Sequence, residues 1–194
     1  MPVDERRRQL LELSSELFAR HSFAELSMAR IAREAGISKA LLYHYFPSKH
    51  DLFMATLAEA AAEVSRRTEP DTSLPPTEAL AASLAAFLGW VDENELAYRK
   101  LLESAGSVPE VGALIADVRD RTSARILDGI GAHTPTARAA VRAWLWFMDG
   151  AILDWFEHRD LEREELRDLL LGSLAGALTA AGCPLPSGPP PSSR

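Results

Sequence analysis

The sequence contains one cysteine, Cys183, among 194 residues. A single thiol can form neither an internal disulfide nor a cysteine-based zinc cluster. A chain without disulfides fits a reducing compartment, so we expect a cytoplasmic protein. The five histidines are scattered without the spacing of a metal site, and we therefore expect no metal and no cofactor.

Long apolar runs are also missing from the sequence. The first residues, MPVDERRRQLL, lack the apolar stretch of a signal peptide, and no run of about 18 apolar residues occurs that could span a bilayer. We therefore expect a soluble protein that is neither secreted nor membrane-bound. The sequence holds no Gly-x-Ser-x-Gly elbow, no phosphate-binding glycine loop and no His-Glu-x-x-His pair, so an enzyme is the less favoured class of function.

The strand-like alternation of Val, Ile and Thr is absent, whereas apolar residues recur at spacings of three and four through nearly the whole chain. This pattern predicts an all-α fold of about nine helices, with an N-terminal three-helix domain that a long fourth helix joins to a C-terminal bundle. We expect these helices to run, approximately, over 4–21, 27–36, 38–46, 48–67, 77–91, 93–104, 109–130, 136–157 and 163–181.

The second and third helices have the spacing of a helix-turn-helix, in which the second helix of the pair lies in the DNA major groove. Ser27 and Ser38 are expected to cap the two helices, and Gly36 to end the first of them in the left-handed conformation. Six apolar residues are predicted to face inward and lock the pair: Ile31, Ala32, Ala35, Ile37, Leu42 and Phe46.

The distribution of charge supports an anionic partner for this segment. The chain has a formal net charge of −7, yet basic residues slightly outnumber acidic ones in the first 52 positions. Residues 27–50 contain one acidic residue, Glu34, and four basic ones, Arg30, Arg33, Lys39 and Lys49. Lys39, Tyr43 and His44 are left on the outward surface, where Tyr hydroxyls and lysine ammonium groups suit DNA phosphates.

The run SMARIAREAGISKALLYHYFPSKHDL, at residues 27–52, closely resembles the signature of the TetR family of transcriptional regulators, with its IA..AG.S, LY.YF and SK..L elements. Leu10-Leu11 and Leu17-Phe18 also match apolar pairs in the first helix of that family. Ser22 stands where the family often has glycine, so we expect the end of the first helix to bend differently. The resemblance is specific over roughly the first fifty residues, and beyond them it rests on architecture.

The resemblance implies which residues of this segment meet DNA. Those expected at phosphates are Ser27, Ser38, Tyr43, His44 and Lys49. Lys39 and Ala40 are expected nearest to base edges. His44 is expected there as well, in addition to its phosphate contact. The partner would be a palindromic operator in double-stranded DNA, bound by a homodimer whose half-sites lie about 34–36 Å apart or at a multiple of that spacing.

The resemblance and the composition together suggest three parts. We expect a helix-turn-helix domain at 1–52, a ligand-sensing and dimerisation domain at 53–182, and a disordered Pro-rich tail at 183–194. Candidates for lining a small-molecule cavity are the large side chains of the bundle, Phe87, Trp90, Tyr98, Leu102, Trp144, Phe147, Met148 and Trp155. Aromatic residues at helical spacing are also what an ordinary core contains.

The family usually pairs its last two long helices with those of a second subunit, as a four-helix bundle. Small residues and leucines of the last helix are the candidates for this contact: Leu166, Leu170, Gly172, Ser173, Leu174, Gly176 and Ala177. A tightly packed monomer core is the alternative for each of them.

The expected function is that of a repressor, which a small and largely apolar effector of unknown identity releases from DNA by favouring one of two conformations. An activator, or a regulator without a small-molecule ligand, remains an alternative for the sensing half. A helical module with a protein partner is a further alternative, but it would have no need for Lys39, Tyr43 and Lys49 on one surface.

Overall fold

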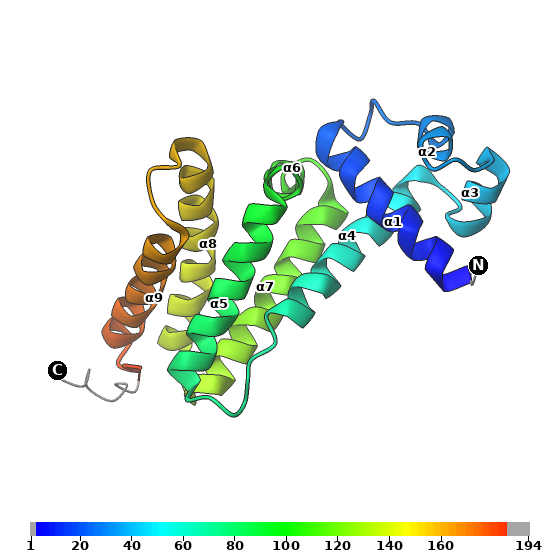
Figure 1. Ribbon diagram of the computed structural model, residues 1–194. Helices are drawn as coiled ribbons and strands as arrows, with labels where there is room; N and C mark the ends of the chain where they lie inside the picture. Colours follow the sequence, from blue (N-terminus) through cyan, green and yellow to red (C-terminus); the bar gives the residue numbers. More distant parts are fainter. Residues whose placement is uncertain (1–2, 186–194) are drawn as a thin grey trace. The chain divides into compact units, whose positions relative to one another are not determined.

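The computed structural model describes residues 3–185. Over this range the chain is helical, with short connections and no strand, as the spacing of the apolar residues predicts (Figure 1). The helices are α1 (Val3–Arg20), α2 (Met28–Glu34), α3 (Lys39–Tyr45), α4 (Lys49–Arg67), α5 (Pro76–Glu93), α6 (Glu95–Ala105), α7 (Pro109–Ile130), α8 (Pro135–His158) and α9 (Arg163–Ala180). In the described part of the chain, no helix is long and apolar enough to cross a bilayer.

The chain forms two compact units. Among the described residues, the first comprises 3–65 and 94–114, and the second comprises 66–93 and 115–185. The boundary expected after residue 52 lies within α4, most of which belongs to the first unit together with α6, which packs on α1. The expected tail at 183–194 falls, from residue 186 onward, outside the described residues.

The core of the first unit is made by the apolar faces of its short helices and by α1. The residues at its centre are almost wholly inaccessible: Leu10, Leu11, Leu26, Ile31, Leu42, Leu52 and Val111. Because α2 and α3 have only seven residues each, they depend on this burial rather than on helix propensity. The core of the first unit therefore holds the helix-turn-helix in one arrangement.

The second unit is built around the pairing of α8 with α9, and α9 also packs on α5 (Figure 1). Four leucines of α9 at spacings of four, Leu166, Leu170, Leu174 and Leu178, have no more than 1% of their surface exposed. The Trp144 indole N–H donates to the carbonyl of Leu170 at 2.9 Å, which also ties α8 to α9.

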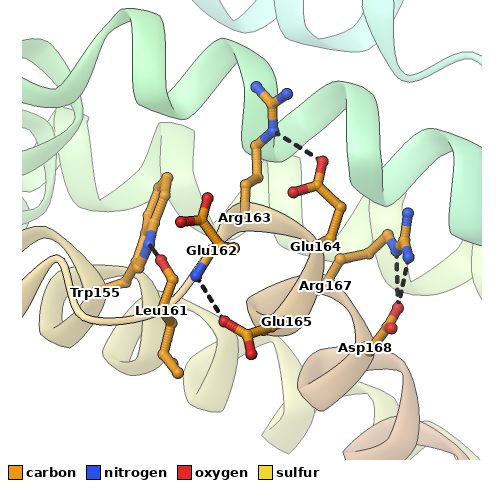
Figure 2. A network of polar contacts seen from close by, with 8 residues as sticks. All are labelled: Trp155, Leu161, Glu162, Arg163, Glu164, Glu165, Arg167 and Asp168. Carbon is orange, nitrogen blue, oxygen red and sulfur yellow. Dashed lines mark hydrogen bonds and ion pairs between the residues drawn. The ribbon is translucent and has the colours of Figure 1, made fainter.

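The connection between α8 and α9 is stabilised by polar contacts (Figure 2). Arg159 ends α8 in the left-handed conformation, at φ 50°, and the Trp155 indole N–H donates to the carbonyl of Leu161 at 2.8 Å. Glu162 and Glu165 then form a capping box at the start of α9, in which the Glu162 N–H donates to the Glu165 carboxylate. These contacts satisfy backbone groups that the helix ends leave without partners.

Candidate nucleic-acid interface

Two serines and one glycine define the helix-turn-helix locally. The Ser27 hydroxyl accepts from the N–H of Arg30 at 3.2 Å, and the Ser38 hydroxyl accepts from the N–H of Leu41 at 3.1 Å. Gly36 adopts φ +64° between the two helices, which a residue with a side chain rarely does. Both caps and the glycine turn have the roles that the sequence predicts.

The inward face of the pair is buried as expected. Ile31, Ala32, Leu42 and Phe46 have 2% or less of their surface exposed, and Ala35 and Ile37 are half-buried. The angle between α2 and α3 is therefore set by close packing, which is stiff because protein interiors leave few voids.

The outward face of α3 carries the predicted contact residues. Lys39, Ala40, Tyr43 and His44 are all exposed, and so are the capping residues Ser27 and Ser38. The Lys39 ammonium lies 5.7 Å from the centre of the Tyr43 ring, so a cation and a phenol share one surface.

The structure adds one residue to this face that the sequence analysis missed. Leu41 is 39% exposed, whereas the next residue, Leu42, is fully buried. If α3 lies in a major groove, as the sequence predicts, an exposed leucine there would suit the C5-methyl group of thymine. The signal in the sequence was the Leu41-Leu42 pair, because adjacent residues of a seven-residue helix cannot both face the core.

Lys49 differs from the other predicted phosphate contacts. Its ammonium donates to the carbonyl of Phe23 at 2.6 Å and to that of Leu26 at 2.9 Å. It also lies 4.1 Å from the centre of the Phe23 ring. Sequence reasoning missed these contacts, because Lys49 is 26 and 23 residues away from these partners along the chain.

The connection between α1 and α2 is itself ordered by polar contacts. The N–H of Ser22 donates to the Glu25 carboxylate at 2.8 Å, and the Ser22 backbone donor lowers the pKa of Glu25, with a smaller contribution from the Ser22 hydroxyl. The Arg30 guanidinium and the His21 ring lie 2.8 Å apart in a hydrogen bond. Within residues 3–185, no cluster of His, Cys, Asp and Glu could hold a metal ion.

The predicted cavity-lining residues are distributed over both units. Tyr98 and Leu102 belong to α6 in the first unit, and the other six belong to the second. Trp90, Tyr98, Trp144, Met148 and Trp155 are buried, Phe87 and Leu102 are half-buried, and Phe147 is exposed. The indole N–H groups of Trp144 and Trp155 donate to backbone carbonyls, which gives both residues a structural role.

The predicted dimer residues separate into two groups on α9. Leu166, Leu170 and Leu174 are buried inside the chain, whereas Gly172 and Gly176 are exposed and Ser173 and Ala177 are half-buried. Three further exposed residues of these helices are apolar. Leu169 of α9 is 50% exposed, and Trp146 and Phe147 of α8 are 66% and 45% exposed. Exposed apolar residues therefore occur on both helices of the α8–α9 pair, and exposed glycines occur on α9.

Comparison with known proteins identifies both parts of the chain. Residues 10–56 match the model of bacterial regulatory proteins of the tetR family, and residues 76–176 match the model of the tetracyclin repressor-like C-terminal domain. A TetR-family regulator of Streptomyces coelicolor has a similar crystal structure, with a TM-score of 0.82 and 31% identity, over 94% of this chain and 84% of that one.

Two curated relatives are transcriptional regulators by name. The transcriptional activator FasR of Mycolicibacterium smegmatis is 30% identical over 142 residues, which are 69% of this chain and 65% of FasR. The transcriptional regulator HbdR of Aromatoleum is 33% identical over 142 residues, which are 68% of this chain and 59% of HbdR. The chain thus spans less than two thirds of the length of both relatives.

The lowered pKa of Glu25 predicts how acid affects the first unit. A carboxylate whose pKa is lowered on folding stabilises the fold above its ordinary pKa, and this contribution disappears as the pH falls through the lowered value. We expect NMR titration to find the Glu25 carboxyl titrating below the ordinary range of glutamate, and the Ser22→Ala variant to raise that pKa part of the way. A Glu25 that titrates normally in the wild-type protein would contradict the contact with Ser22.

Proposed function

The chain belongs to the TetR family of DNA-binding transcriptional regulators, which are not enzymes, and we propose that it binds operator DNA through the exposed face of α3. The observation that carries this proposal is the arrangement of α3 itself. Its inward side is locked by Leu42, while Lys39, Tyr43 and His44 are exposed on the other side. We propose a cytoplasmic location, because bacterial operator DNA lies there.

The proposed DNA contacts are of two kinds, those to phosphates and those to base edges. Ser27, Ser38, Tyr43 and His44 offer hydroxyl and ring N–H groups for phosphates, which fix the register of a protein on DNA. Lys39 and Ala40, in the first turn of α3, and Leu41 beside them are proposed to meet base edges in the major groove. The cationic part of this surface makes the binding sensitive to salt, because each phosphate contact releases counterions.

The Ser38→Asp variant separates capping from DNA contact. Aspartate is as good a cap as serine, so we expect the free energy of unfolding to change by less than about 0.5 kcal/mol. The new carboxylate faces DNA phosphates, and we expect the affinity for a duplex selected by the wild-type protein to fall by about tenfold or more, as measured by fluorescence anisotropy.

The matched control is Thr134→Asp, which makes the same kind of change at the cap of α8, where the Thr134 hydroxyl accepts from the N–H of Ala137. We expect its DNA affinity to equal that of the wild type. Equal affinities for the Ser38→Asp variant and the wild type would contradict the proposed surface.

We propose that a second copy of the chain covers the exposed residues Trp146, Phe147, Leu169, Gly172 and Gly176 of α8 and α9, which together define the proposed face. Large exposed apolar side chains beside glycines favour close helix packing. The buried leucines Leu166, Leu170 and Leu174 support this face from within the protomer, so the proposed contact shifts away from them. A symmetric dimer presents two copies of α3 to a palindromic operator.

The Leu169→Glu variant tests the dimer. A carboxylate without a partner in an apolar interface is strongly unfavourable, so we expect the dimer dissociation constant to rise by about a hundredfold or more. Analytical ultracentrifugation at micromolar concentration measures this change. The control is Leu96→Glu on α6, where the leucine is 59% exposed and lies outside the proposed face. A monomeric wild-type protein, or a dimer indifferent to Leu169→Glu, would contradict the proposal.

We propose that the second unit binds a small, largely apolar effector and responds to it. Support comes from its large apolar side chains, among them the half-buried Phe87 and the buried Met148, which suit an apolar ligand. An effector acts by binding the DNA-competent form and the released form with different affinities. Repression is the proposed outcome, and activation is the second candidate because the relative FasR is named an activator.

Transcription from a promoter next to the selected DNA site distinguishes these outcomes. If the protein represses, we expect removal of its gene to raise the activity of a reporter at that promoter, because the bound dimer no longer obstructs it. A fall in reporter activity would instead establish activation. The Ser38→Asp variant serves as the control, since it should behave as the deletion does.

A further inference from the structure

Lys49 begins α4, and its ammonium is already engaged within the chain. It donates to the carbonyls of Phe23 and Leu26, at 2.6 and 2.9 Å, and lies against the Phe23 ring. We call Lys49, Phe23 and Leu26 the Lys49 clamp. An ammonium has three N–H donors, so the clamp leaves one of them for any further partner.

The position of Lys49 on its helix makes the clamp informative. A cation in the first turn of a helix is unfavourable, because the backbone dipole places positive charge there. Hydrogen bonds to two carbonyls and contact with an aromatic face offset this cost, since each is a favourable partner for an ammonium. Neither carbonyl accepts a backbone hydrogen bond from the described residues, so Lys49 also supplies the partners that these groups need.

The clamp joins the connection between α1 and α2 to the scaffold of the first unit. The Phe23 ring packs on Phe53 of α4 with 5.2 Å between ring centres, and Phe53 packs on Phe18 of α1 at 4.9 Å. Leu26 is 1% exposed and directly precedes Ser27, the cap of α2. Fixing the Leu26 carbonyl therefore fixes the point at which α2 begins.

We propose that Lys49 is a positioning residue of the helix-turn-helix, which holds the start of α2 through the Lys49 clamp, and is not a phosphate contact. The inference rests on the proposed DNA-binding function. It revises the role expected from the sequence, in which Lys49 meets a phosphate directly. A positioning residue lowers DNA affinity without changing how many ions binding releases, whereas a phosphate contact contributes to that number.

The salt dependence of DNA binding distinguishes these roles. The slope of the logarithm of affinity against the logarithm of salt concentration changes by about 0.9 for each phosphate that a variant no longer neutralises. We expect Lys49→Met to lower the affinity for the selected duplex by about tenfold, as removal of charge-assisted hydrogen bonds would, with an unchanged slope. Lys39→Met is the comparison, and we expect it to make the slope shallower, because the exposed Lys39 ammonium lies on the proposed DNA surface and displaces counterions there.

Two further measurements separate the clamp from general damage to the fold. Phe23→Leu alters the clamp without removing a charge, so we expect weaker binding with the wild-type slope. Hydrogen exchange in the DNA-free protein should be faster at the amides of residues 22–30 in Lys49→Met, and unchanged there in Lys39→Met.

A shallower slope for Lys49→Met, or wild-type exchange at residues 22–30 in that variant, would overturn the inference. A wild-type protein whose DNA binding does not depend on salt would overturn the proposed function instead. In that case the exchange measurement would still decide whether Lys49 holds the connection.

Discussion

The burial of Ile31 in α2 and of Leu42 in the neighbouring α3 is the constraint on which the rest of the first unit depends. Both side chains are fully buried, and they belong to helices of seven residues that are too short to be stable alone. Burial of these residues, together with the caps of Ser27 and Ser38, converts two short segments into one rigid surface. The exposed side chains of α3 have a defined geometry only because the opposite side of the helix is locked in this way.

The second unit is also held together by the burial of apolar side chains. Its long helices bury a regular row of leucines inside the chain, and α8 and α9 still leave Trp146 and Leu169 exposed. These exposed residues lie where we propose the contact with a second copy of the chain. In the proposed dimer, symmetric pairing would place two copies of α3 on one operator and would link operator geometry to the conformation of the bundle.

Helix bounds were predictable to within two residues because the signals that end helices are local. Ser27, Gly36 and Ser38 act within three residues of themselves, and the structure gives each of them its expected role. Contacts between distant residues were not predictable in the same way. Nothing in the sequence near Lys49 indicates that its ammonium meets the carbonyl of Phe23. The exposed face of α8 was also hidden, because that helix is apolar almost all round and its spacing does not tell Phe147 from Met148.

The most direct test of the central claim is an NMR map of backbone amides during titration with a duplex selected by the protein. We expect the largest shifts on residues 27–49, in α2, α3 and the turns around them, and on the exposed residues of α3 above all. Shifts concentrated in α8 and α9, with α3 unchanged, would contradict the claim that this chain reads DNA through its helix-turn-helix.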